Sequence, residues 1–369
     1  MKVIITGGGT GGHIYPALAV ALELKNRGWN ILYLGSENSL EKEVTKEWDV
    51  NFKSVKVAPL PRKINFKLIN SLFSNLSGLY QSRKIIKKFK ADVVFGTGGY
   101  VSGAVVLAGF LSSRKTIIHE QNVYPGVTNK ILSRFTDKIA INFKDAEKYF
   151  PVNTGNKLIH TGNPVRKIIF ETNRNTGIKY FNFSSSSKTV LIFGGSQGAE
   201  KINKSLSEIY KFIIEHKNFQ LIHITGKNNF KQVTNYLKNN DINPENYSKI
   251  KIIPYLKHME YAYAAADLVI SRAGATALSE ITAKGLPAIL IPYPYATGDH
   301  QKYNAQYLAK NEAAIMIEEK DLNEKILVEK FKKIVSDQLL LKEMSENSYK
   351  LGRRKAAAEI VNEIEKLVQ

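Results

Sequence analysis

Two glycine-rich turns carry the groups in this sequence best suited to bind a phosphate. The first, Gly7–His13, follows the apolar run Lys2–Thr6, and the second, Gly194–Gly198, follows Thr189–Phe193. Each pattern is typical of a strand, a tight turn and the start of a helix, which directs backbone N–H groups and the positive end of a helix dipole at an anion. The duplication predicts two similar halves that hold one nucleotide-type ligand between them.

His13 is the first candidate for a group that accepts a proton during a reaction. It stands where the first turn becomes a helix, with Pro16 in the same helical turn. The positive end of a helix disfavours an imidazolium, so we expect a neutral ring that can take up a proton. A capping or packing role is the alternative interpretation of the same residue.

Polar residues follow four more strand-like runs, at the ends where parallel strands form a ligand crevice. In the first half they are Gly96–Gly103, another glycine-rich turn, and His119–Asn122; in the second half they are Ser271–Glu280 and Pro292–Asn304. The carboxylate of Glu280 is suited to accept hydrogen bonds from ribose hydroxyls. Ordinary turns, surface loops and helix capping explain the same residues without a ligand.

Strand-like runs that alternate with helical stretches must position these turns, and they predict an α/β fold with two doubly wound parallel sheets. The expected strands are Lys2–Thr6, Asn30–Leu34, Val93–Phe95, Lys115–His119, Lys138–Ile141, Thr189–Phe193, Leu221–Thr225, Lys251–Ile253, Leu268–Ser271 and Ala288–Ile291.

The turn chemistry of Gly162–Arg166 makes it the expected hinge between domains. We expect a first Rossmann-like domain over 1–163, a second over 164–340 and a terminal segment over 341–369. A long charged helix, roughly Leu339–Leu367, is expected to pack back on the first domain.

Composition limits the class of protein. The chain has 369 residues, 43% of them hydrophobic and none of them cysteine, which allows two ordinary cores and excludes disulfides, thiolate metal sites and cysteine nucleophiles. No apolar run approaches the ~18 residues of a membrane-spanning helix, and the immediate first strand leaves no room for a signal peptide, so we expect a cytoplasmic protein. The sequence lacks an Asp-x-Asp pair, a Gly-Lys-Ser/Thr turn and a Gly-x-Ser-x-Gly elbow, so we expect no metal, no other cofactor, no Walker-type ATP site and no hydrolase nucleophile.

The net charge of +20 is concentrated in residues 53–134, which hold fourteen Lys or Arg against two acids. An apolar stripe at helical spacing runs through this region and ends in basic residues, as in an interfacial membrane helix. The stripe is Leu68, Ile69, Leu72, Phe73, Leu76, Leu79 and Tyr80, followed by Arg83, Lys84, Lys87 and Lys88. Phe110–Leu111, close to Arg114–Lys115, is a second candidate. A core-facing stripe with solvated lysines is the alternative.

A nucleic-acid partner would explain the positive charge but none of the glycine-rich turns, so we expect no nucleic-acid partner.

The motifs GGGTGGH, GTGGYVSG, HEQN, GNPVR, GGSQGA, SRAGATALSE and DHQ…NA occur in this order from residue 7 to about residue 305. In this order they resemble the MurG family of peptidoglycan N-acetylglucosaminyltransferases, which convert lipid I to lipid II in cell-wall biogenesis. The resemblance implies a GT-B fold, with the active site between two Rossmann-like domains. It also implies a peripheral protein on the cytoplasmic face of the cell membrane, with cell-wall synthesis proteins among its conceivable partners.

The resemblance also implies residue roles. Contacts to UDP-N-acetylglucosamine fall on Thr10, Gly11, Gly12, Asn122, Arg166, Ser196, Leu256, Ala275, Thr276, Ala277, Leu278, Ser279, Glu280 and Gln301. The acceptor would meet Gly98, Gly99 and Tyr100. Leu256 stands where the family usually has Ile.

The chemistry expected is a direct displacement with inversion at the anomeric carbon, without a metal. His13 is the first candidate for the general base and Glu120 the second. A glycolipid synthase of the same fold that acts on diacylglycerol remains an alternative, although the HEQN and GTGGY motifs disfavour it. A nicotinamide dehydrogenase, for which Glu37 would supply the ribose contact, and a non-enzymatic membrane scaffold remain two more.

Overall fold

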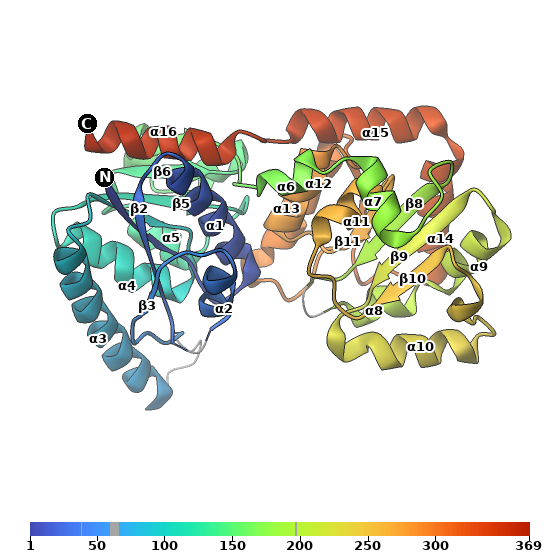
Figure 1. Cartoon of the computed structure of the whole chain (residues 1–369), viewed down its shortest axis with the longest axis horizontal. Helices are drawn as coiled ribbons and strands as arrows, with labels where there is room; N and C mark the ends of the chain where they lie inside the picture. Colours follow the sequence, from blue (N-terminus) through green and yellow to red (C-terminus); the bar gives the residue numbers. More distant parts are fainter. Residues whose placement is uncertain (38, 60–65, 196–197) are drawn as a thin grey trace. The chain divides into compact units, whose positions relative to one another are not determined.

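The computed structural model describes residues 1–37, 39–59, 66–195 and 198–369 of the chain. These residues form two compact units. Unit 1 combines residues 1–166 with residues 353–369, and unit 2 comprises residues 167–352 (Figure 1). The first crossing between the units, after Arg166, is the end of the turn that the sequence predicts as a hinge.

Unit 1 contains a parallel sheet of seven strands in the order β3-β2-β1-β4-β5-β6-β7. The strands are β1 (Lys2–Thr6), β2 (Asn30–Gly35), β3 (Phe52–Ser54), β4 (Val93–Gly96), β5 (Lys115–Glu120), β6 (Lys138–Ile141) and β7 (Leu158–His160). The helices are α1 (Gly11–Asn26), α2 (Leu40–Glu47), α3 (Phe66–Phe89), α4 (Gly99–Phe110), α5 (Val127–Leu132) and α16 (Ala356–Val368), with 3-10 turns η1 (Lys144–Tyr149) and η2 (Val152–Lys157).

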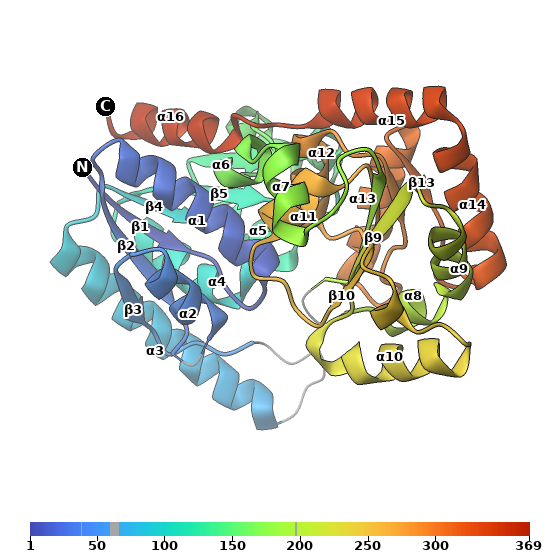
Figure 2. The ribbon, with the colours of Figure 1, turned by 45° about the vertical axis from the view of Figure 1, so that its right-hand side comes forward.

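Helices cover both faces of this sheet. Alternate residues of each strand point to opposite faces and so join different cores. Val3 and Ile5 of β1 join the core formed with α1 and α16, whereas Ile4 joins the core formed with α3 and α4. Figure 2 shows α16 along α1, the helix against which it packs.

Unit 2 contains a parallel sheet of six strands in the order β10-β9-β8-β11-β12-β13. The strands are β8 (Lys188–Phe193), β9 (Phe219–Ile224), β10 (Ile250–Ile253), β11 (Leu268–Ser271), β12 (Ala288–Leu290) and β13 (Ala314–Met316). The helices are α6 (Lys167–Glu171), α7 (Arg174–Phe181), α8 (Glu200–Lys204), α9 (Ser207–Glu215), α10 (Phe230–Asn239), α11 (Met259–Ala265), α12 (Ala275–Lys284), α13 (His300–Lys310), α14 (Glu324–Ser336) and α15 (Gln338–Leu351), with 3-10 turns η3 (Lys227–Asn229), η4 (Pro244–Asn246) and η5 (Thr297–Asp299).

The single terminal helix predicted over Leu339–Leu367 is wrong, because the structure has two helices there, α15 and α16. The break falls at Gly352, the last residue of unit 2. A Cβ at Gly352 would lie 2.4 Å from the carbonyl oxygen of Thr282 on α12. This close backbone approach requires glycine, and the chain leaves helical geometry there before it enters unit 1.

Candidate active site

Each sheet has a switch point, where neighbouring strands lead to helices in opposite directions and ligands bind in α/β proteins. In unit 1 the switch point lies between β1 and β4, and in unit 2 it lies between β8 and β11. The four loops that leave these strands begin at Gly7, Thr97, Gly194 and Arg272. All four belong to motifs that the sequence identifies as candidate site elements.

His13 lies in the first turn of α1, as the sequence predicts, and its ring points toward the loop after β4. Its Nδ1 lies 2.9 Å from the carbonyl oxygen of Thr97, while the Thr97 hydroxyl donates a hydrogen bond of 2.8 Å to the His13 carbonyl. A carbonyl only accepts, so Nδ1 carries the hydrogen in the neutral ring and Nε2 is the nitrogen that accepts a proton. The loop thus fixes the tautomer that a general base requires.

The two glycine-rich turns of unit 1 approach each other closely enough to exclude side chains. A Cβ at Gly99 would lie 2.2 Å from the Gly8 carbonyl oxygen, and Gly98 and Gly99 adopt φ values of 101° and 81°. A Cβ at Gly98 would also lie 3.0 Å from the His13 ring. Glycine at 98 and 99 is therefore needed to place the loop against His13, whether or not these residues also touch an acceptor.

Tyr100 is the second residue of α4 and lies next to the glycine-rich turn after β1. Its ring lies 3.3 Å from where a Cβ of Gly9 would be, and its hydroxyl lies 3.2 Å from the Ser36 hydroxyl. Thr10 caps α1 through its carbonyl, which accepts hydrogen bonds from the N–H groups of His13 and Ile14, and its side chain makes no capping bond. Gly11 and Gly12 follow as the first residues of the helix.

Glu120 is buried and saturated with hydrogen bonds. Oε1 accepts from the backbone N–H and the side-chain amide of Asn122, at 2.9 and 3.1 Å. Oε2 accepts from the backbone N–H of Gly126 at 3.0 Å and the amide of Asn129 at 2.8 Å. These four donors fix the orientation of the carboxylate, which shapes the loop around Asn122. This geometry favours a structural role for Glu120 and leaves His13 as the stronger candidate base.

His119 and Gln121 connect this loop to His13 from inside the unit. The Gln121 amide donates to the Thr97 carbonyl at 2.7 Å, so this oxygen accepts from both Gln121 and His13. The same amide lies 3.1 Å from His119 Nδ1, and His119 Nε2 lies 2.9 Å from the Gly162 carbonyl oxygen. Burial lowers the pKa of His119 to about 4, against a smaller opposing effect of the bond to Gly162, and the ring is neutral at physiological pH.

Arg166 ends the first segment of unit 1, and its guanidinium lies over aromatic rings. Its guanidinium lies 5.0 Å from the ring centre of Tyr15 on α1 and 5.7 Å from that of Trp48. Cation–π contacts of this kind fix the orientation of the planar group. Tyr15 is two residues from His13, so the structure brings Arg166 to the same helix end as the candidate base.

In unit 2, the glycine-rich turn after β8 is described except for residues 196 and 197. Ser196, the residue expected to hold the diphosphate, therefore lies outside the described residues. The flanking geometry fits a tight turn: Gly195 and Gly198 have φ values of 86° and 76°, and the Gly198 N–H donates to the Gly195 carbonyl at 2.9 Å.

The residues expected to contact ribose and phosphate form the first two turns of α12. Gly274 caps this helix, and Ala275, Thr276 and Ala277 follow. Leu278 and Ser279 are buried, and the Ser279 hydroxyl donates to the Ala275 carbonyl at 2.8 Å. Leu278 thus contributes backbone groups at most.

Two further predicted contacts come from other loops at the same edge of this sheet. Gln301, at the start of α13, accepts a hydrogen bond of 3.0 Å from the Tyr293 N–H through its Oε1, which turns its NH2 group away from that bond. Leu256 is buried after β10, the outer strand, three positions from β11. Ala275–Glu280 and Gln301 thus follow two neighbouring strands, β11 and β12. Leu256 follows β10, further along the sheet.

Three residues that shape these loops were not recognisable from the sequence. Thr97 and Gln121 hold the His13 ring, and Arg272 donates to the carbonyls of Ile291 and Pro292 at 3.3 and 3.2 Å. Arg272 also forms an ion pair with Glu319. All three motifs are visible in the sequence, but their function depends on main-chain carbonyls of other loops, which residue types do not reveal.

Comparison with known proteins assigns both units to one family. Residues 3–141 match the glycosyltransferase family 28 N-terminal domain, and residues 189–363 match the glycosyltransferase family 28 C-terminal domain. Among solved structures, MurG of Acinetobacter baumannii is similar with a TM-score of 0.75 and 26% identity over 99% of both chains. The two parallel-sheet α/β domains therefore confirm the predicted GT-B class.

Curated relatives match along the whole chain. One, from Halothermothrix orenii, is described as a UDP-N-acetylglucosamine–N-acetylmuramyl-(pentapeptide) pyrophosphoryl-undecaprenol N-acetylglucosamine transferase; it is 47% identical over 99% of this chain and 98% of its own length. A relative of the same description from Bacillus subtilis is 40% identical over 100% and 99%. A UDP-GlcNAc 2-epimerase from Neisseria meningitidis bound to UDP-GlcNAc, at 15% identity, 99% and 100% coverage and a TM-score of 0.69, shares the fold alone. With relatives this similar from end to end, the chain belongs to glycosyltransferase family 28.

Proposed function

We propose that this chain transfers N-acetylglucosamine from UDP-N-acetylglucosamine to the C4 hydroxyl of lipid I, which yields lipid II for peptidoglycan synthesis. The observation that carries the proposal is the identity of 40 to 47%, over nearly full length, with relatives described as this transferase. The loops at the switch points of both sheets supply the polar groups that such a reaction needs.

The reaction proceeds by direct displacement with inversion. The C4 oxygen of the muramyl sugar forms a bond to the anomeric carbon, the bond from that carbon to the UDP oxygen breaks, and the proton of the C4 hydroxyl passes to a general base. His13 is this base, because its Nδ1–H bond to the Thr97 carbonyl makes Nε2 the proton acceptor. UDP leaves with the electron pair of the broken bond.

The proposed contacts to the donor are the residues that the resemblance implies, and each unit supplies its own set. In unit 1 they are Thr10, Gly11, Gly12, Asn122 and Arg166; in unit 2 they are Ser196, Leu256, Ala275, Thr276, Ala277, Leu278, Ser279, Glu280 and Gln301. N–H groups at the starts of helices and the Arg166 guanidinium stabilise the charge on the leaving diphosphate without a metal. The acceptor lies against Gly98, Gly99 and Tyr100, and Glu120 keeps the adjoining loop in shape.

Lipid I, the proposed acceptor, is anchored in a membrane. In this proposal, α3 of unit 1 is the surface that binds the membrane. Of the predicted stripe, the structure describes side chains from Ile69 onward. Five of them are exposed, from 48% for Leu72 to 72% for Tyr80, and only Leu79 packs against the core. The four basic residues that follow are also exposed: Arg83, Lys84, Lys87 and Lys88. Apolar side chains bordered by lysine and arginine suit an anionic bilayer surface.

Phe110 and Leu111 are each 44% exposed at the end of α4, the helix on which α3 packs. They are a second exposed apolar pair in unit 1. No helix in the described ranges is both long and apolar enough to cross a bilayer. We propose that the protein associates peripherally with the cytoplasmic face of the membrane. We expect cell-wall synthesis proteins among its partners and no nucleic acid.

The test is transfer in a defined mixture. Purified protein is incubated with labelled UDP-N-acetylglucosamine and a lipid I analogue, with EDTA present, and the disaccharide product is separated and its anomeric configuration determined. A β-linked disaccharide supports donor, acceptor, inversion and metal independence together. Product with diacylglycerol and none with lipid I would instead identify a glycolipid synthase. No product with either acceptor would refute the proposed transfer.

A further inference from the structure

A chain of buried hydrogen bonds in unit 2 lies outside the residues used so far. The Tyr210 hydroxyl on α9 lies 2.8 Å from His223 Nδ1 on β9, and His223 Nε2 lies 3.0 Å from Asn203 Oδ1 on α8. Asn203 in turn donates through Nδ2 to the Thr225 carbonyl at 3.1 Å. None of the four residues is more than 4% exposed. Buried polar groups of this kind cost stability unless every partner is in place.

These buried hydrogen bonds have only one consistent direction of donation. The Asn203 NH2 must face the Thr225 carbonyl, because a carbonyl only accepts, and this leaves the amide oxygen facing His223. His223 therefore donates through Nε2–H and accepts from the Tyr210 hydroxyl at Nδ1. Burial lowers the pKa of His223 to about 3, so the neutral ring that this pattern requires is present at physiological pH.

Thr225, the last residue in this series of hydrogen bonds, supports the glycine-rich turn after β8 at Gly198. The Thr225 carbonyl oxygen lies 2.2 Å from where a Cβ of Gly198 would be, so the turn rests directly on it. The same carbonyl accepts from the Asn229 amide at 3.3 Å. A shift of Thr225 would displace Gly198, which closes the turn expected to hold the diphosphate.

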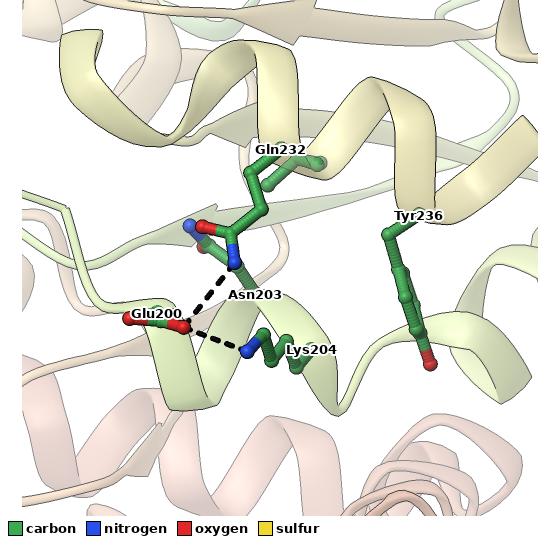
Figure 3. Close-up of a pocket in the computed structure, with 6 residues that line it drawn as sticks. Glu200, Asn203, Lys204, Gln232 and Tyr236 are labelled. Atoms are coloured by element: carbon green, nitrogen blue, oxygen red, sulfur yellow. Dashed lines mark hydrogen bonds and ion pairs between the residues drawn. The ribbon is translucent and has the colours of Figure 1, made fainter.

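Helix α8, which carries Asn203, is also tied down on its outer side. Glu200 pairs with Lys204 at 2.7 Å and accepts from the Gln232 amide of α10 at 3.2 Å (Figure 3). These contacts are exposed, so they contribute little. The buried chain through His223 is the stronger constraint on the position of Asn203.

We propose that His223 is a positioning residue for donor binding, which acts through Asn203 and Thr225 to hold Gly198 in place, at the end of the glycine-rich turn expected to bind the UDP diphosphate. This inference rests on the proposed function, because it assumes that the turn binds UDP. His223 touches no substrate; it links the core of unit 2 to the site.

The test compares two substitutions on the same strand. His223→Leu removes both hydrogen bonds with little loss of volume. The matched control, Gln220→Leu, removes a buried amide whose partners, Ser184 and Thr189, lie at the other end of β9. UDP affinity is measured by calorimetry on the full chain, together with melting temperature and the KM values for UDP-N-acetylglucosamine and the lipid I analogue.

We expect His223→Leu to weaken UDP binding and raise the donor KM by roughly tenfold or more, with the acceptor KM unchanged. His223→Gln restores an acceptor and a donor at similar separation and should bind UDP almost as the unmodified protein does. Gln220→Leu should lower the melting temperature and leave UDP affinity intact. Equal UDP affinity in His223→Leu, or an equal loss in Gln220→Leu, overturns the inference.

If His223→Leu does not fold, Tyr210→Phe decides the question. It removes only the hydroxyl that fixes the His223 ring, and we expect several-fold weaker UDP binding; unchanged binding contradicts the proposal. A failure of the proposed function looks different, because the unmodified protein itself would then not bind UDP or would not transfer N-acetylglucosamine to the lipid I analogue.

Discussion

The Thr97 carbonyl has more influence on the chemistry than its residue type suggests. It accepts from His13 and from Gln121, so one main-chain oxygen fixes both the tautomer of the candidate base and the loop that follows β5. A base held in this way does not have to reorient before it takes a proton. If His13 is the base as proposed, we therefore expect its contribution in the transfer step and not in substrate binding.

Replacing His13 by Ala or Asn should lower kcat by about 10²- to 10⁴-fold, the usual contribution of a general base. UDP affinity should stay within a few-fold of the unmodified protein. Steady-state kinetics with the lipid I analogue and calorimetry with UDP measure the two quantities. His216→Ala, at an exposed histidine that follows α9, is the control. A His13→Ala variant with normal kcat would exclude the residue as the base.

Glu120→Gln separates a structural carboxylate from a second base. An amide cannot accept on both sides, so donors from Asn122, Gly126 or Asn129 lose a partner, at a cost of about 1–3 kcal/mol each. We expect a melting temperature several degrees lower and a weakened donor affinity, with the shape of the pH–rate profile retained. Loss of the profile's acid limb would show instead that Glu120 takes the proton.

The sequence identified the residue types of the site better than their roles. His13 was recognisable as a candidate because it begins a helix after a glycine-rich turn, and Glu120 because it belongs to a polar motif that follows an apolar strand. Their partners were not, since Thr97 acts through its carbonyl and is 84 residues from His13. The relay from Tyr210 to Thr225 was invisible for the same reason, because it depends on burial and on contacts between separate elements.

At the scale of elements, α3 is notable because it exposes five large apolar side chains, at Ile69, Leu72, Phe73, Leu76 and Tyr80. Reversing the charge of Arg83, Lys84, Lys87 and Lys88 to Glu should release the protein from anionic vesicles, since each basic residue near such a surface contributes about 1 kcal/mol. Co-sedimentation with vesicles rich in phosphatidylglycerol measures the effect. Turnover of a water-soluble acceptor analogue should change little.

The control for this experiment has the same change of charge on unit 2. The exposed lysines Lys231, Lys238, Lys325 and Lys333 are changed to Glu. If this control is released from vesicles as readily as the α3 variant, net charge alone drives binding and the α3 surface has no special role.

Helix α16 is a core element of unit 1 despite its distance in sequence. Ile360, Val361 and Ile364 are fully buried against β-strand residues such as Val3. Ile360→Ala should therefore cost about 2–5 kcal/mol. Both tryptophans, Trp29 and Trp48, belong to unit 1, so fluorescence reports the unfolding of this unit.

Val152→Ala is the comparison for Ile360→Ala, because Val152 is fully exposed in η2 of the same unit and its truncation should change stability by less than about 0.5 kcal/mol. Equal effects of the two substitutions would contradict the packing of α16 on unit 1.

The strands that the sequence missed are all short and at sheet edges. β3, β7 and β13 each have three residues and lie at the outside of their sheets. Edge strands are covered on fewer sides, so Phe52–Ser54 and Leu158–His160 lack the continuous apolar run that reveals a central strand such as Lys188–Phe193. The central strands, which carry the site loops, were predictable to within two residues at either end.

For the molecule as a whole, each unit contains a fully buried neutral histidine, and both should make stability depend on pH. Burial lowers the folded-state pKa of His119 to about 4 and of His223 to about 3, below the unfolded value of 6.5. The unfolded chain then binds more protons in this window, so the stabilising contribution is complete above about pH 6.5 and is lost as pH falls toward 4.

Between pH 7 and pH 5, His119 alone should reduce the free energy of unfolding of unit 1 by about 2 kcal/mol. Burial also lowers the pKa of His160, which acts in the same direction. Urea titrations followed by tryptophan fluorescence measure the change. His119→Gln, which cannot titrate, should show a flatter dependence, and an identical slope would exclude His119 as the cause.

The position of α16 also has a consequence for how the chain is made. A ribosome releases residues 1–166 first, but these residues lack one of the helices that cover their sheet until the whole of unit 2 has been synthesised. Unit 2 is continuous in sequence and can complete its core as soon as it emerges. The first-made half of the protein is therefore the last to finish folding. Until then the β1 face that receives Ile360 is open to chaperones and to other nascent chains.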